Sequence, residues 1–276
     1  MTNLFGTIQG RLLPKYKGRY QAHPVGYWEN EFHVAKELKL DCIEFILDHN
    51  DADQNPLLNS DELKKLESVI FETGVIVKTI CADYFMEAPL HSKDEIVAKK
   101  SMLVLEKLLQ SAEKLNVSDI VVPCVDQSSL LDDGAVIRFV SQINKIIPDI
   151  EKRGINLSLE TDLNPKKFVE LLDKFDSKRI TVNYDIGNSA SLGFDPIEEL
   201  NAYGDKITDI HIKDRMLGEG PVMLGKGNAD FQLFFKKLKE FNYKGPFIMQ
   251  AYRDDEGLEM FKVQKNWIKK HLDLLQ

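Results

Sequence analysis

The feature that most constrains the fold is a regular alternation of short apolar runs with longer amphipathic stretches along the chain. The apolar runs are rich in Ile and Val, which is typical of strands buried on both faces of a sheet. They predict eight strands, at residues 4–9, 42–47, 75–82, 119–125, 155–161, 180–186, 207–213 and 246–251. The amphipathic stretches predict helices at residues 29–39, 60–74, 92–116, 134–154, 164–175, 195–204, 230–242 and 258–275.

Strands that alternate with helices usually pair in parallel, which places the chain in the α/β class. Eight strand–helix units in 276 residues favour a (β/α)8 TIM barrel, with a single domain over residues 1–276. A doubly wound open sheet is the structural alternative. Its dinucleotide-binding version loses support because no G-x-G-x-x-G turn follows the first predicted strand.

Composition narrows the range of partners. The formal net charge of −8 argues against a nucleic-acid partner, because such binding depends on neutralising phosphates with basic residues. No apolar run is long enough to span a membrane, and the first residues lack the pattern of a signal peptide. We therefore expect a cytoplasmic protein with a small-molecule partner. Cys42, Cys81 and Cys124 each lie in an apolar run and are predicted to be buried free thiols.

Polar residues stand at the carboxyl ends of the last four predicted strands. These residues are Glu160, Asp185, His211 and Gln250. In a TIM barrel this end carries the active site, and adjacent strands are only about 4.8 Å apart, so the side chains can converge. Any one of them alone is more often a cap or a hydrogen-bonded core residue. Together, two carboxylates, an imidazole and an amide oxygen predict one divalent metal ion, with Mn, Mg, Co, Fe or Zn all suitable.

The sequence resembles the xylose isomerase-like TIM barrel superfamily, in its sugar (phosphate) isomerase/epimerase branch. The resemblance rests on the segments LSLETD, NYDIGNSASLGFDP, DIHIKDR, LGKGNADF and GPFIMQ. It implies one divalent cation held by Glu, Asp, His and Glu, of which Glu160, Asp185 and His211 match the first three. Gln250 stands where the family usually has its second glutamate, and Asn188 stands where many members have His and some have Asn.

The implied reaction removes a proton next to a carbonyl group and passes through an enediolate. Glu160 is the expected base, and Lys213 is a second catalytic candidate. Gln250 cannot accept a proton, although its amide oxygen can still bind a metal ion. A site with one base suits aldose–ketose isomerisation, whereas ketose epimerisation would need a second base. The expected substrate is a sugar or a sugar phosphate, and the resemblance implies a possible homo-oligomer.

Further polar residues near the strand ends are candidates for substrate binding. They are Gln9, Arg11, Asn188, Asp214, Arg215 and Arg253. Cationic side chains in this position can bind hydroxyl groups, a carboxylate or a phosphate, although a surface salt bridge is the simpler interpretation of each arginine. The glycine-rich loop at residues 216–231 can act as a lid over the site.

Other functions remain open from the sequence. A metal-dependent sugar or hydroxy-acid dehydratase would use the same barrel, with Lys213 or His23 as the acid that expels hydroxide. A non-catalytic sugar-binding protein is a second alternative, because Gln250 can also be interpreted as the mark of a disabled site. The endonuclease branch of the superfamily is disfavoured, since it uses three zinc ions and many histidines, and this chain has six.

Overall fold

Eight parallel strands close into a barrel in the computed structural model, which describes residues 3–254 and 257–272. Around the barrel the strands follow the order β1-β10-β7-β6-β5-β4-β3-β2. Their bounds are β1 Phe5–Ile8, β2 Cys42–Ile46, β3 Ile76–Cys81, β4 Asp119–Cys124, β5 Asn156–Thr161, β6 Ile180–Asp185, β7 Ile207–Ile212 and β10 Phe247–Met249. The predicted TIM barrel is confirmed, and the open doubly wound sheet is excluded because β1 pairs with both β2 and β10.

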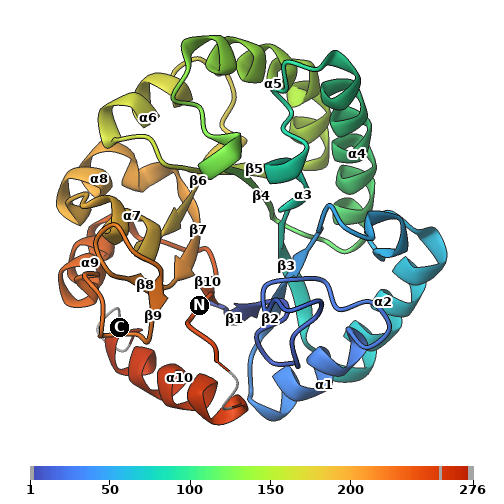
Figure 1. Cartoon of the computed structure of the whole chain (residues 1–276), viewed down its shortest axis with the longest axis vertical. Coiled ribbons are helices and arrows are strands. Elements are labelled where there is room, and N and C mark those ends of the chain that lie inside the picture. Colours follow the sequence, from blue (N-terminus) through green and yellow to red (C-terminus); the bar gives the residue numbers. More distant parts are fainter. Residues whose placement is uncertain (1–2, 255–256, 273–276) are drawn as a thin grey trace.

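Helices form an outer ring around the strands (Figure 1). Those foreseen from the periodicity are α1 Glu29–Glu37, α2 Ser60–Thr73, α4 Glu95–Lys114, α5 Asp133–Arg153, α6 Pro165–Leu172, α8 Pro196–Tyr203, α9 Phe231–Leu238 and α10 Leu258–Leu272. The residues 273–275 that were predicted to end the last helix lie outside the described residues. Asn164 and Asp195 cap α6 and α8 through their side chains. Both helices begin at a proline, which fits the first helical position because an N–H there would have no partner within the helix.

Several short elements were not foreseen, and most of them follow strand ends. They are α3 Tyr84–Glu87, α7 Ile186–Leu192, the hairpin of β8 Asp214–Arg215 and β9 Pro221–Val222, and the 3₁₀ turns η1 Ala52–Gln54, η2 Asp126–Ser128, η3 Gly204–Lys206 and η4 Lys239–Phe241. None is long enough to show a helical or strand period in the sequence. Their positions matter, because α7 and the β8–β9 hairpin both extend the end of the barrel that carries the candidate site.

The core has two parts. A small cluster that includes Ile8, Ile46, Cys81, Val121 and Ile248 is buried apart from the main core, and a much larger cluster contains the apolar faces of the helices together with other strand residues. All three cysteines are buried and free, as predicted. Within the described residues, no helix is both long and apolar enough to cross a membrane.

Candidate metal centre at the carboxyl ends of the barrel strands

Three of the four predicted metal ligands converge at the ends of adjacent strands. Glu160 lies on β5, Asp185 ends β6, and His211 lies on β7 directly beside Asp185 in the strand register. One ligand atom from each of the three residues lies within 4.8 Å of the others, and all three residues are buried. Two carboxylates and an imidazole at this spacing could hold a divalent ion.

The fourth predicted ligand, Gln250, directly follows β10, the strand next to β7. Its backbone N–H donates to the carbonyl oxygen of Ile212 at 3.0 Å. Its side chain is buried, and Nε2 donates to Oε1 of Gln21 at 2.8 Å. Oε1 of Gln250 and Nδ1 of His211 are buried atoms without a hydrogen-bond partner among the described residues. Buried polar atoms are nearly always paired. Unpaired acceptors at the ends of the adjacent strands β7 and β10 fit a cation bound at this end of the barrel.

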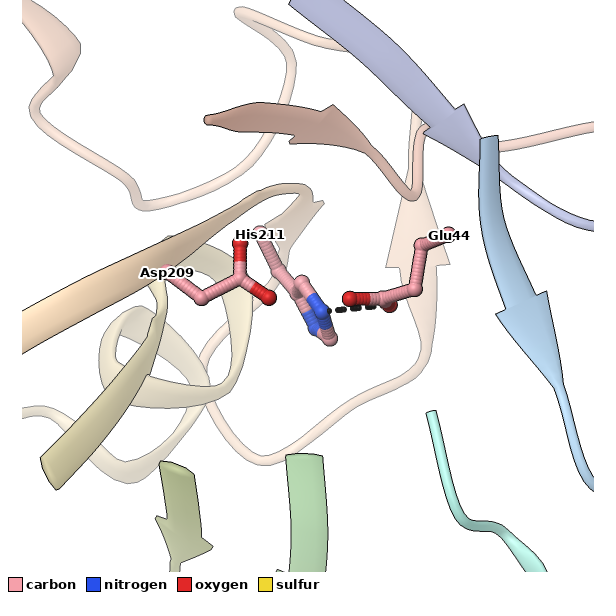
Figure 2. A group of neighbouring side chains, drawn as sticks. All are labelled: Glu44, Asp209 and His211. Atoms are coloured by element: carbon pink, nitrogen blue, oxygen red, sulfur yellow. Dashed lines mark ion pairs between the residues drawn. The ribbon is translucent and has the colours of Figure 1, made fainter. Parts of the chain in front are cut away.

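Figure 2 shows the imidazole of His211 between the carboxyl groups of Glu44 and Asp209. Nε2 of His211 lies 2.8 Å from Oε1 of Glu44, which comes from β2 across the barrel. The other oxygen of Glu44 accepts a hydrogen bond of 2.8 Å from Oγ1 of Thr79. A histidine that binds a metal usually donates its second nitrogen to a carboxylate. Because Nε2 of His211 faces Glu44, Nδ1 is the ring nitrogen that remains to bind a metal ion.

Asp209 completes this support as a second carboxyl group, two residues before His211 on β7. Burial raises the pKa of Glu44 to about 7. Burial, followed by the charge of Glu44, raises the pKa of Asp209 well above its usual range. We therefore assign the proton to Asp209 and the accepting role to Glu44. Glu44, Asp209 and His211 also meet the spacing of a metal site, and all three are fully buried. Both oxygens of Asp209, Oε1 of Glu44 and Nε2 of His211 make no hydrogen bond within the described residues, so the support rests on the 2.8 Å contact between Glu44 and His211.

Glu160 is oriented by a short chain of hydrogen bonds. Its Oε1 accepts from Nδ2 of Asn188 at 2.6 Å, and Oδ1 of Asn188 accepts from Nη1 of Arg215 at 2.8 Å. Burial raises the pKa of Glu160 to about 7, with a further contribution from the negative charge of Asp185. A base works best when its pKa lies near the operating pH, so this environment suits proton transfer.

Lys213 pairs with one of the predicted ligands. Its Nζ lies 3.2 Å from Oδ2 of Asp185. The backbone of α7 presses against this lysine, because a Cβ on Gly187 would lie 2.7 Å from Cγ of Lys213. The contact holds the amino group of Lys213 beside a predicted metal ligand, within reach of a bound substrate. Its catalytic role stays a prediction.

Asp214 holds the glycine-rich loop at residues 216–231 through hydrogen bonds to the loop backbone. Its Oδ2 accepts from the backbone N–H groups of Gly225 and Gly227 at 2.9 and 2.8 Å, and its Oδ1 accepts from that of Ala229 at 3.2 Å. The residue is fully buried, and a Cβ on Gly227 would lie 2.1 Å from Oδ1. Because the loop engages both oxygens, this geometry favours a structural role over the predicted contact with substrate.

The Asp214→Ala substitution is expected to loosen the loop and to lower the free energy of unfolding by about 2–4 kcal/mol, since three N–H groups lose a charged acceptor. Urea unfolding would give the energy, and limited proteolysis would show cleavage within residues 216–231. The Asp230→Ala variant is a matched control, because Asp230 accepts one backbone N–H at the start of α9 and is exposed. Equal stability and equal cleavage in both variants would contradict the anchor.

Two predicted residues lie where the chain leaves β1. Gln9 is fully buried, and its Oε1 accepts from the backbone of Ile46 at 3.1 Å, while its Nε2 is unpaired. Arg11 donates from Nη2 to Oε1 of Gln21 at 3.2 Å. Arg253 follows β10, and its guanidinium group lies over the ring of Tyr20 at 5.0 Å.

His23, the alternative acid, is packed among aromatic rings. Ring centroids of Trp28 and Phe45 lie 6.2 and 5.3 Å away. Burial lowers the pKa of His23 to about 3, so the imidazole is neutral at physiological pH. A neutral imidazole is a weak acid, which removes one of the two groups on which the dehydratase alternative depends.

Comparison with known proteins places these features in a family. The sequence matches the family described as xylose isomerase-like TIM barrel over residues 32–275. It is 26% identical to L-ribulose-5-phosphate 3-epimerase UlaE of Salmonella paratyphi A over 260 residues, which cover 90% of this chain and 92% of the relative. The sequence relatives are thus distant sugar epimerases.

Solved structures share the architecture. A D-psicose 3-epimerase determined in the presence of D-fructose superposes with a TM-score of 0.72 and 18% identity, covering 98% of this chain and 94% of its own. The IOLI protein with a bound zinc atom superposes with a TM-score of 0.77 and 15% identity, covering 99% of both chains. At these identities the likeness shows the fold alone.

Proposed function

Because the chain belongs to the xylose isomerase-like TIM barrel family, we propose that it is a metal-dependent epimerase or isomerase of a sugar or sugar phosphate. The observation that carries this proposal is the convergence of Glu160, Asp185 and His211. Gln250 follows the neighbouring strand β10, and its Oε1 is unpaired within the described residues. These four side chains would hold one divalent ion. When bound, such an ion polarises a carbonyl group and stabilises the negative charge that develops on the substrate.

Gln250 has a defined orientation, which supports a ligand role over a disabled site. Its Nε2 donates to Gln21, whose own Nε2 donates to Oδ2 of Asp83 at 3.1 Å. Asp83 in turn accepts from Sγ of Cys81 at 3.1 Å. This series of hydrogen bonds orients the amide group of Gln250 so that its oxygen is the atom left unpaired. With Glu160 and Asp185, the ligand set carries a charge of −2, which balances a divalent ion.

Glu160 is the group we assign to proton transfer. Asn188 engages one lone pair of its Oε1. The carboxylate keeps acceptor sites for both the ion and the proton next to the substrate carbonyl. In an isomerisation, the same carboxyl group returns the proton to the neighbouring carbon on the same face. In an epimerisation, a second group must deliver a proton from the opposite face, and Lys213 is the candidate because its Nζ lies 3.2 Å from Oδ2 of Asp185. The relatives favour epimerisation, whereas Gln250 favours the one-base reaction.

Solvent-deuterium exchange tests the proposal. The purified protein would be loaded with Mn²⁺, Mg²⁺ or Co²⁺ in D₂O and incubated with ketoses and ketose phosphates of five and six carbons. We expect proton NMR to show metal-dependent exchange at the carbon next to the carbonyl in one substrate class, with loss of exchange after chelation. The stereochemistry of the product distinguishes an epimerase from an isomerase. Absence of exchange from every substrate would support a binding protein instead.

A further inference from the structure

Two arginines at the mouth of the barrel have donors that no acceptor satisfies. Nε of Arg11 and both Nε and Nη1 of Arg253 are buried and unpaired within the described part of the chain. Gln9 adds a third unpaired donor, Nε2, at the end of β1. Guanidinium nitrogens donate and cannot accept, so these atoms need an oxygen-rich, electron-rich partner. Buried donors without partners are rare in native structures and call for a ligand.

The first loop of the chain joins these arginines to the candidate metal centre. The guanidinium group of Arg253 lies over the aromatic ring of Tyr20. The next residue, Gln21, accepts a hydrogen bond from Arg11 through its amide oxygen. The same amide oxygen of Gln21 accepts from Gln250. The backbone of Gly10 makes this approach possible, since a Cβ there would lie 1.8 Å from the carbonyl oxygen of Tyr20. The two cations therefore stand beside the metal centre.

The nearest carboxylates are already engaged by other donors. Glu31 accepts from the backbone N–H groups of Gly10 and Leu12. Asp83 accepts from Gln21 and from Cys81. Burial lowers the pKa of Arg11 to about 10, the charges of Asp83 and Glu31 oppose this shift, and the charge of Arg253 adds to it. A guanidinium group with this pKa is still charged at neutral pH. The two carboxyl groups offset part of this positive charge but leave the unpaired guanidinium N–H groups without an acceptor among the described residues.

We propose that Arg11 and Arg253 form a phosphate subsite, and that the substrate of the neighbouring metal centre is a sugar phosphate. This inference rests on the proposed function for the site, and it adds the anionic group that the substrate carries. Two guanidinium groups match a phosphate monoester, which carries a charge between −1.5 and −2 at neutral pH and three acceptor oxygens. A carboxylate offers one negative charge and two oxygens, so it would satisfy the pair less completely.

The subsite can be tested by binding alone, with probes that have no carbonyl group and therefore cannot react. Calorimetry would compare ribitol 5-phosphate, ribonate and ribitol, each with metal-loaded and metal-free protein. We expect ribitol 5-phosphate to bind best in both states. The Arg11→Gln and Arg253→Gln variants should each weaken its binding by about 10- to 100-fold, since each removes charge-assisted hydrogen bonds. Binding of ribitol should not change.

Two further variants control for effects that do not depend on the subsite. Arg179→Gln is the matched control, because Arg179 pairs with Asn156 at the opposite end of the barrel and should leave every affinity unchanged. Arg253→Lys keeps the charge but loses the planar pair of donors, so it should give an intermediate affinity even if Arg253→Gln folds poorly. Thermal melting would confirm that each variant is folded.

The outcomes separate this proposal from the proposed function. Arginine-dependent binding of ribitol 5-phosphate, in a protein that exchanges no deuterium, would support the subsite and contradict the epimerase or isomerase activity. Exchange restricted to unphosphorylated ketoses would support the activity and overturn the subsite. Equal affinity for ribitol and ribitol 5-phosphate, stronger binding of ribonate, or full affinity in the folded arginine variants would each overturn the subsite as well.

Discussion

Glu160→Gln is expected to slow deuterium exchange into the substrate by about 10²- to 10⁴-fold, which is the usual contribution of a general base. The amide can no longer take the proton, although its oxygen can still accept from Asn188. NMR exchange rates at saturating Mn²⁺ and substrate would measure the loss. Saturation matters because the substitution also removes one negative charge beside the ion.

Glu170→Gln provides the control, because this residue is exposed on α6 and the substitution makes the same chemical change away from the site. Its exchange rate should equal that of the wild type. Wild-type exchange in Glu160→Gln would show that another group moves the proton, and Lys213 would be the next candidate to substitute.

Gln250→Leu is expected to weaken Mn²⁺ binding by at least about 10- to 100-fold, since even residues that only support a ligand have effects of this size. Leucine fills a similar volume without an oxygen. Gln250→Glu should do the opposite, because it raises the charge of the ligand set from −2 to −3. Calorimetric titration of the metal-free protein with Mn²⁺ measures both changes.

Gln264→Leu is a suitable control for this pair, because Gln264 is also buried but bonds Leu224 and Tyr252 from α10. This control should keep its full affinity for Mn²⁺, even where it lowers the free energy of unfolding. Unchanged Mn²⁺ affinity in both Gln250 variants would show that the amide oxygen is not a ligand. The network through Gln21 would then have a purely structural role.

The barrel and its predicted ligands could be anticipated because both depend on local patterns. Buried parallel strands leave continuous apolar runs, and the polar residue that ends each run marks the functional end of the barrel. Glu160, Asp185 and His211 converge for this reason, since neighbouring strands bring their ends together whatever the loops do. Asp209 was missed, although its spacing of two residues from His211 places both side chains on one face of β7.

Other parts of the site could not be foreseen, because they depend on where a loop packs. Gln21 lies in the long irregular segment between β1 and α1, and nothing in its neighbourhood signals a contact with β10 more than 200 residues later. Asp214 was predicted to bind substrate from its place at a strand end. Its carboxylate is instead used by backbone N–H groups from a loop whose path the sequence does not specify.

The adjacency of Tyr20 and Gln21 has a consequence for selectivity. Tyr20 contacts Arg253 and Gln21 contacts Gln250, so a single peptide unit joins the proposed phosphate subsite to the proposed metal ligand. We therefore expect this loop to set the length of the substrate that the proposed site accepts. Chain length would be retuned by insertions or deletions between β1 and α1, with the barrel strands left untouched.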